Sequence, residues 1–110
     1  MKSGRPEVAG LGSFEEQVML AVVRTGAEAY GMTVRRELEA VTGRSITIGS
    51  VYITLDRLEA KRLVRSDRAP ATPGGPSRRV FSLTPSGARA LADTRTVRER
   101  LWKGVALSTE

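Results

Sequence analysis

The sequence predicts a mainly α-helical domain with a small β-ribbon of two or three strands, an α+β class. Three observations carry this prediction. Apolar residues recur at helical spacing over most of the chain. Two short segments with strand-like character, Leu63–Asp67 and Arg79–Leu83, flank a stretch rich in proline and glycine. Thr84 and Pro85 then mark the start of another helix, because threonine is a common N-cap and proline suits the first helical turn.

The composition limits the function classes. The 110 residues suffice for one small domain with one hydrophobic core. The chain has no cysteine and no histidine, which excludes thiol nucleophiles, disulfides, the usual zinc sites and imidazole bases. No catalytic motif, metal site or cofactor motif is recognisable, so we do not expect an enzyme. No apolar run could span a bilayer and Met1–Gly10 has no hydrophobic signal core. We therefore expect a cytoplasmic protein without a membrane partner.

The net charge of +6 is unevenly distributed. Residues 1–43 carry five basic and six acidic side chains, residues 44–83 carry eight and three, and residues 84–110 carry five and three. The basic excess lies on the third predicted helix and the ribbon, which suggests a polyanionic partner. Basic charge that only keeps a small domain in solution is the alternative, and charge alone does not separate the two.

Two helices are predicted in the first part of the domain, after a mobile tail over residues 1–10. The first has Ser13 as its N-cap, with Glu16 completing a capping box, and ends near Gly26. The second runs from about Tyr30 to Gly43, where glycine supplies a positive φ. The expected inward faces are Phe14, Val18, Ala21 and Val22 on the first helix, and Val34, Leu38 and Val41 on the second.

A third helix is predicted over Ser50–Lys61, after the short apolar run Ile46–Ile48, with Thr47 or Ser50 as its cap. Hydroxyl groups, one apolar side chain and two cations should face outward, which is typical of a helix that contacts bases in a DNA groove. An ordinary solvated face has the same composition. Val51, Leu55 and Leu58 should face the core, Tyr52 should lie between the faces, and the outward residues are Ser50, Ile53, Thr54, Arg57 and Lys61.

The ribbon strengthens the DNA-binding interpretation. Phe81 and Leu83 alternate onto one side, which should be the core side. The loop Arg68–Ser77 is rich in proline and glycine and should project as a flexible wing. Guanidinium groups match phosphate geometry, although charges at a sheet edge also protect it from aggregation. The arginines that cluster at the base of the loop are Arg65, Arg68, Arg78 and Arg79. A helix followed by such a ribbon is the order of a winged helix.

The last helix should run from Pro85 toward Lys103. It has little of a small core left to lie on, so its thin apolar stripe is interpreted as a homodimer contact. Packing on the first helix of the same chain is the alternative. The expected interface residues are Val97, Leu101, Trp102 and Val105, and the stripe also holds Ala90 and Thr94, with Leu91 beside it.

Four segments in this order resemble the PadR family of bacterial transcriptional regulators, over about Leu11–Leu91. They are Leu-Gly-Ser-Phe-Glu at 11–15, Ala-Tyr-Gly-Met at 29–32, Gly-Ser-Val-Tyr-Ile-Thr-Leu-Asp-Arg-Leu-Glu at 49–59 and Arg-Val-Phe-Ser-Leu-Thr-Pro-Ser-Gly at 79–87. The resemblance implies a winged helix-turn-helix over residues 11–84. It also implies homodimerisation through residues 85–110 and repression by binding a palindromic operator in double-stranded DNA. By the same resemblance, Ser50, Tyr52 and Thr54 contact DNA, with Arg57 close by and the wing arginines on the backbone.

The sequence departs from the family pattern in two places. Similar proteins usually have glycine after the recognition helix, where this chain has Lys61-Arg62-Leu63. Arg62 should therefore adopt a left-handed conformation, or else the helix should end differently. Many relatives also carry a larger C-terminal helical region, so a small-molecule effector is left open. The competing hypothesis for the whole chain is a winged-helix protein-interaction module that does not bind DNA.

Overall fold

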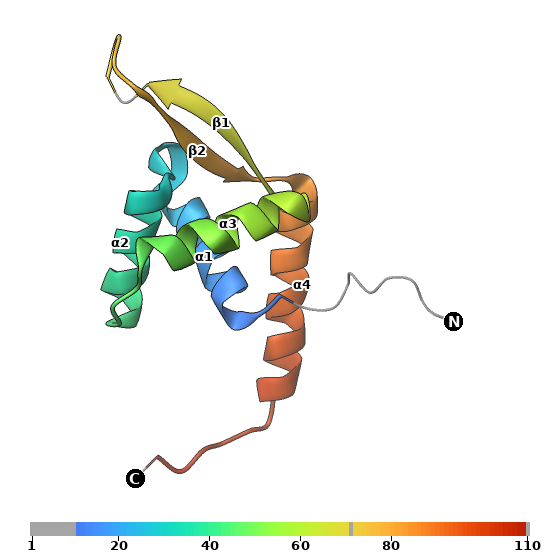
Figure 1. Cartoon of the computed structure of the whole chain (residues 1–110). Helices are drawn as coiled ribbons and strands as arrows, with labels where there is room; N and C mark the ends of the chain where they lie inside the picture. Colours follow the sequence, from blue (N-terminus) through green and yellow to red (C-terminus); the bar gives the residue numbers. More distant parts are fainter. Residues whose placement is uncertain (1–10, 71, 110) are drawn as a thin grey trace.

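The computed structural model describes residues 11–70 and 72–109, which form four α-helices, one 3-10 helix and a two-stranded antiparallel sheet (Figure 1). The mobile tail predicted for residues 1–10 lies outside the described residues. None of the described helices is long and apolar enough to cross a membrane. The elements are α1 (Ser13–Thr25), η2 (Gly26–Glu28), α2 (Gly31–Thr42), α3 (Ile48–Ala60), β1 (Val64–Pro70), β2 (Ser77–Leu83) and α4 (Pro85–Trp102). This order confirms the predicted α+β class.

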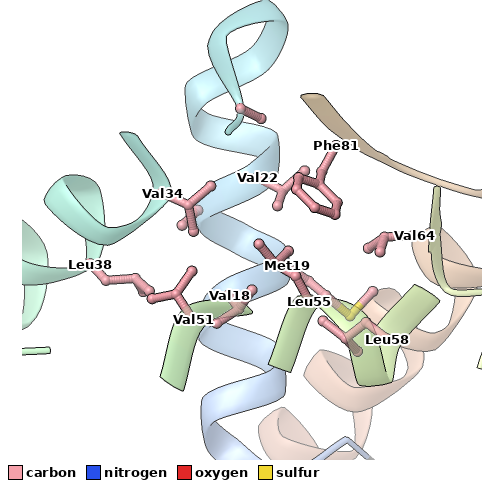
Figure 2. Close-up of a cluster of buried hydrophobic side chains, with 12 residues drawn as sticks. Val18, Met19, Val22, Val34, Leu38, Val51, Leu55, Leu58, Val64 and Phe81 are labelled. Carbon is pink, nitrogen blue, oxygen red and sulfur yellow. The ribbon is translucent and has the colours of Figure 1, made fainter. Parts of the chain in front are cut away.

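The core lies between α1, α2, α3 and the inner face of the sheet (Figure 2). Phe81 extends from β2 toward Val22 of α1, and Val64 of β1 lies beside them. The helical spacing predicted most of the inward faces, although Phe14 is only partly buried and Met19 is buried without having been predicted. Fully or nearly fully buried side chains include Val18, Met19, Ala21, Val22, Val34, Leu38, Val51, Leu55, Leu58, Val64 and Phe81.

The start of α1 differs from the predicted capping box. Gly12 is the N-cap, and the Glu15 carboxylate accepts a hydrogen bond from the Gly12 N–H at 3.1 Å. The predicted pairing of Ser13 with Glu16 is wrong because the chain enters the helix one residue earlier. Glu16 is instead buried and forms an ion pair with Arg98 of α4.

The bounds of α2 match the prediction, with Tyr30 as N-cap and Gly43 in the left-handed region at φ 70°. Val34 and Leu38 are buried as expected. The prediction for Val41 is wrong, since this side chain is 62% exposed. Its spacing places it on the same face, but it lies in the last turn, beyond the part of α2 that the neighbouring elements cover.

α3 begins at Ile48, two residues before the predicted start, and Thr47 is its cap. The Thr47 hydroxyl accepts a hydrogen bond from the Ser50 N–H at 3.2 Å. The apolar Ile48 therefore belongs to the first turn of the helix and not to a separate apolar segment.

The two strands are longer than predicted. Their antiparallel register runs from Val64 opposite Leu83 to Pro70 opposite Ser77. The connection between them is therefore residues 71–76 and not the whole of Arg68–Ser77. Proline is tolerated at position 70 because it lies at the end of an edge strand, where no donor is needed. The Phe81 N–H donates to the Ala29 carbonyl at 2.7 Å, which ties the other edge of β2 to the segment before α2.

The connection from α3 to β1 resolves the question raised by Arg62. Arg62 has a φ of 62°, in the left-handed region. Its N–H donates to the Glu59 carbonyl at 2.9 Å, and the Leu63 N–H donates to the Leu58 carbonyl at 2.9 Å. This pair of hydrogen bonds is a Schellman motif, in which glycine usually occupies the position that Arg62 holds here.

The same connection receives the start of α4. The Thr84 hydroxyl donates to the Arg62 carbonyl at 2.7 Å and accepts from the Gly87 N–H at 2.9 Å. Gly87 packs directly on the backbone of Leu63, where an added Cβ would lie 1.9 Å from the Leu63 carbonyl oxygen. The end of α3, the start of β1 and the start of α4 are thus joined at one point of the backbone.

α4 runs down one side of the molecule, away from the wing (Figure 1). Near its start Gly87 is buried and Leu91 packs against the core. Further along, Arg98 reaches Glu16 of α1. Of the residues predicted to form an interface, Val97, Leu101 and Trp102 are exposed on α4. Val105 is also exposed, but it does not continue the helical stripe because α4 ends at Trp102 and Gly104 turns the chain at a φ of 77°.

Candidate nucleic-acid interface

α3 presents a narrow exposed face opposite its buried residues. Ile53 is 60% exposed, and Asp56, one turn further on, has 60% of its side chain exposed. Arg57 is exposed at the flank of this face, and Gly49 and Ala60 complete it. Because Val51, Leu55 and Leu58 anchor the other side in the core, the helix holds these groups at fixed positions.

Thr54 does not belong to this face, and the prediction that it is exposed is wrong. Only 5% of the residue is exposed. Thr54 lies three residues after Val51 and four before Leu58, a spacing that places all three on the same side of a helix. Its hydroxyl made it look like a surface residue, but its position assigns it to the buried side.

Ser50 and Tyr52, two of the predicted DNA-contacting residues, also contact other parts of the chain. The half-buried Ser50 donates from its hydroxyl to the Thr47 carbonyl at 2.8 Å. Tyr52 lies between the two faces as predicted, with 37% exposed. Its ring lies on Gly31 at the start of α2, where an added Cβ would come within 2.3 Å of the ring. Gly31 therefore allows α2 and α3 to approach closely at this point.

The two predicted cations of α3 differ in their surroundings. The Lys61 Nζ lies 2.7 Å from Oε2 of Glu15. Burial raises the pKa of Glu15, but hydrogen bonds from Lys61 and the Gly12 N–H, together with nearby positive charge, bring it below its ordinary value of 4.5. Arg57 forms no ion pair with any residue that the structure describes. Arg57 is thus available to an external anion, whereas Lys61 is already engaged.

Arg79 is not the free wing cation that the sequence suggested. Its Nη1 lies 3.0 Å from Oδ1 of Asp56 and its Nη2 lies 2.7 Å from Oε1 of Glu59. Glu59 also accepts a hydrogen bond from the Ser66 hydroxyl at 2.9 Å. Burial lowers the pKa of Arg79, but the two carboxylates outweigh it and raise the pKa above its ordinary value. Arg79 therefore ties β2 to the exposed side of α3.

The other wing arginines are arranged differently. The guanidinium of Arg78 stacks over the Tyr30 ring, 3.7 Å from its centroid. Arg65 and Arg68 are exposed on β1 and have no ion-pair partner in the described ranges 11–70 and 72–109. Arg68 lies opposite Arg79 in the register, which places it on the face of the sheet that Arg79 uses to reach α3.

Sequence reasoning missed one residue at the centre of the exposed face of α3, Asp56. It lies three residues after Ile53, so the same helical spacing that placed Ile53 outward would have found it. Across residues 11–70 and 72–109 there is no group of three or more acidic, histidine or cysteine side chains that could hold a metal.

Comparison with known proteins places the chain in a family. The family model of the "Transcriptional regulator PadR-like family" matches residues 19–93, more than half of the chain. Over 78 residues the chain is 36% identical to transcriptional regulator Rv3488 of Mycobacterium tuberculosis, covering 71% of this chain and 70% of that protein. This chain belongs to the PadR-like family of transcriptional regulators.

Solved structures of PadR-like proteins share the fold. A PadR-like transcriptional regulator from Bacillus cereus matches with a TM-score of 0.69 at 18% identity, over 82% of this chain and 84% of that one. A PadR family regulator from Eggerthella lenta matches with a TM-score of 0.63 at 26% identity, over 79% and 75%. The predicted winged-helix fold and the resemblance to PadR are thereby confirmed. The family consists of transcriptional regulators and not of enzymes.

Proposed function

We propose that this PadR-like chain binds double-stranded DNA sequence-specifically and represses transcription as a homodimer on a palindromic operator. The observation that carries the proposal is the link between α3 and the wing. Arg79 joins the outward side of α3 to β2 through Asp56 and Glu59. A helix that fits a major groove and a basic strand that can reach the adjacent backbone therefore move as one unit.

The cations available to phosphates lie on this unit. Arg57 of α3 and Arg65 and Arg68 of β1 are exposed, and the described part of the chain gives them no ion-pair partner. Each phosphate that such a group neutralises should make the slope of log K, the binding constant, against the logarithm of the salt concentration steeper by about 0.9. Several contacts per protomer would thus make binding strongly dependent on ionic strength.

A second copy of the chain is the proposed occupant of the exposed face of α4. Val97, Leu101 and Trp102 are exposed apolar residues of α4, and Val105 lies just beyond its end. Leu101, Trp102 and Val105 line a shallow groove of about 160 Å³. A two-fold contact through this face would place two recognition helices on one duplex. Such dimers bind palindromic half-sites separated by one helical turn, about 34 Å, or a multiple of it.

A protein-interaction module that does not bind DNA is the second candidate. It is supported by the internal engagement of Lys61 with Glu15, of Arg79 with Asp56 and Glu59, and of Arg78 with the Tyr30 ring. These contacts leave fewer free cations than the sequence suggested. A small-molecule effector stays a prediction, and titration of Trp102 fluorescence is the way to look for one.

The two candidates are separated by selection from a pool of random duplexes, followed by titration across a range of salt concentrations. We expect the full chain to enrich defined duplexes. The double variant Arg65→Ala, Arg68→Ala should weaken selected and random duplexes about equally and reduce the salt slope by about 0.9 per lost contact. The double variant Arg89→Ala, Arg100→Ala on α4 loses the same charge and should keep the wild-type slope. A chain that retains no duplex at low salt would favour the interaction module.

A further inference from the structure

The centre of the proposed DNA-binding face carries an acidic residue. Asp56 lies one turn after Ile53 and one turn before Ala60, and 60% of its side chain is exposed. A carboxylate at this position would approach a polyanion. Repulsion would make such a residue unfavourable unless its charge is neutralised and its oxygens meet a donor.

Arg79 supplies the neutralisation. Its Nη1 contacts Oδ1 of Asp56 at 3.0 Å, while its Nη2 is held by Glu59, which Ser66 fixes in turn. The guanidinium also lies over the Phe81 ring, 4.8 Å from its centroid, so its position is set from several sides. The carboxylate of Asp56 is therefore oriented from the wing side and stays open toward solvent.

The remaining hydrogen-bonding capacity of Asp56 is that of an acceptor only. A carboxylate has about four lone-pair positions, and within the described residues Arg79 provides its ion-pair contact through Oδ1 alone. In the major groove, guanine presents only acceptors and thymine presents an acceptor and a methyl group. Cytosine presents the N4 amino donor, whereas adenine is best matched by a side chain that both donates and accepts.

We infer that Asp56 accepts a hydrogen bond from the N4 amino group of a cytosine, and that Ile53 contacts a thymine methyl in the same half-site. This inference rests on the proposed DNA-binding function and names the base composition that α3 recognises. Arg79 is then a positioning residue, which neutralises and orients Asp56 from the wing. The operator half-site should contain a cytosine and a thymine within reach of one turn of α3.

The test compares duplex selection by the wild type with selection by Asp56→Asn. Asparagine keeps the shape of the side chain but adds a donor and removes the charge. The matched control is Asp67→Asn, because Asp67 is exposed on the opposite face of the sheet from Arg79 and has no ion-pair partner in the described part of the chain. Both variants change the net charge equally, so a general electrostatic effect on phosphates should appear in both.

We expect the wild type and Asp67→Asn to enrich the same cytosine position. Asp56→Asn should lose this preference by about tenfold or more, with the other positions of the site unchanged. Ile53→Ala should relax the thymine position in the same way. Thermal melts should show that all variants are folded at the temperature of selection.

Three results would overturn the inference. Unchanged selection by Asp56→Asn would show that the Asp56 carboxylate does not select the cytosine. An equal rise in affinity for all duplexes in both asparagine variants would show that Asp56 acts only by repulsion. Enrichment of duplexes without a cytosine preference in the wild type would overturn this inference alone, whereas no enrichment at all would overturn the proposed function with it.

Discussion

Replacing Arg62 with glycine should stabilise this PadR-like domain. Arg62 follows Lys61, the C-cap of α3, at a φ of 62°, where the Cβ of an L residue crowds the following carbonyl oxygen. Its backbone N–H and carbonyl are both hydrogen bonded, to the Glu59 carbonyl and from the Thr84 hydroxyl. Glycine would keep these hydrogen bonds and remove the strain.

The expected gain follows from two opposing effects. The left-handed conformation costs a non-glycine residue about 1–2 kcal/mol. Glycine loses more conformational freedom on folding, which offsets about 0.4–1 kcal/mol of this gain. The net stabilisation should therefore be about 0.5–1 kcal/mol, which corresponds to a rise in melting temperature of roughly 3–6 °C for a domain of this size.

Thermal and urea unfolding of the wild type, Arg62→Gly and Arg62→Ala measure this effect. Alanine is the matched control because it removes the charge and the long side chain but keeps the Cβ. We expect alanine to be close to the wild type and glycine to be more stable than both. If glycine is no more stable than alanine, the strain at position 62 does not exist and the account of this connection is wrong.

Three further predictions concern other parts of the molecule. Thr54→Lys should destabilise the fold by about 2 kcal/mol or more in urea unfolding, because Thr54 is buried. Ile53→Lys should change the stability little, because Ile53 is exposed. Equal effects of the two substitutions would contradict the assignment of Thr54 to the buried face and of Ile53 to the exposed face. Glu15 has a lowered folded pKa, so its stabilisation is present above its ordinary pKa of 4.5 and is lost as the pH falls through the lower folded value. Glu15→Gln should therefore flatten the fall in stability below about pH 4.5 in acid titrations, and an unchanged slope would refute the role of the Lys61 contact. Leu101→Asp should shift the proposed dimer to monomer in sedimentation at micromolar concentration, and a wild type that is already monomeric would remove the dimer model.

Local patterns along the chain predicted the helices and much of the core. Val51, Leu55 and Leu58 share one helical face by spacing alone, and all three are buried. Thr84 and Pro85 carry their own capping chemistry, so the start of α4 could be placed to the residue. These features depend only on neighbours within one or two turns, which a sequence contains in full.

The features that the sequence misplaced depend on contacts from elsewhere in the fold. By sequence, either Glu15 or Glu16 could complete a capping box at the start of α1. In the structure Glu15 caps the helix through the Gly12 N–H, while Glu16 pairs with Arg98 of α4, a contact that the local sequence does not show. The hydroxyl of Thr54 favours an exposed position, but its spacing from Val51 and Leu58 places it on the buried side of α3. Arg79 lies 20 positions from Glu59, and only the folded ribbon brings the two together. The proposed DNA-binding face therefore has fewer free cations than a count of basic residues suggests.

Sequence-specific recognition of duplex DNA by α3 is the central claim, and the ratio of two affinities tests it most directly. The measurement is the dissociation constant of the full chain for its best selected duplex and for a scrambled duplex of the same composition, at one physiological salt concentration. We expect the selected duplex to bind about a thousandfold or more tightly, the range typical of specific DNA-binding proteins. A ratio near one, at any affinity, would show that the chain binds DNA only through its charge, and would contradict recognition by α3.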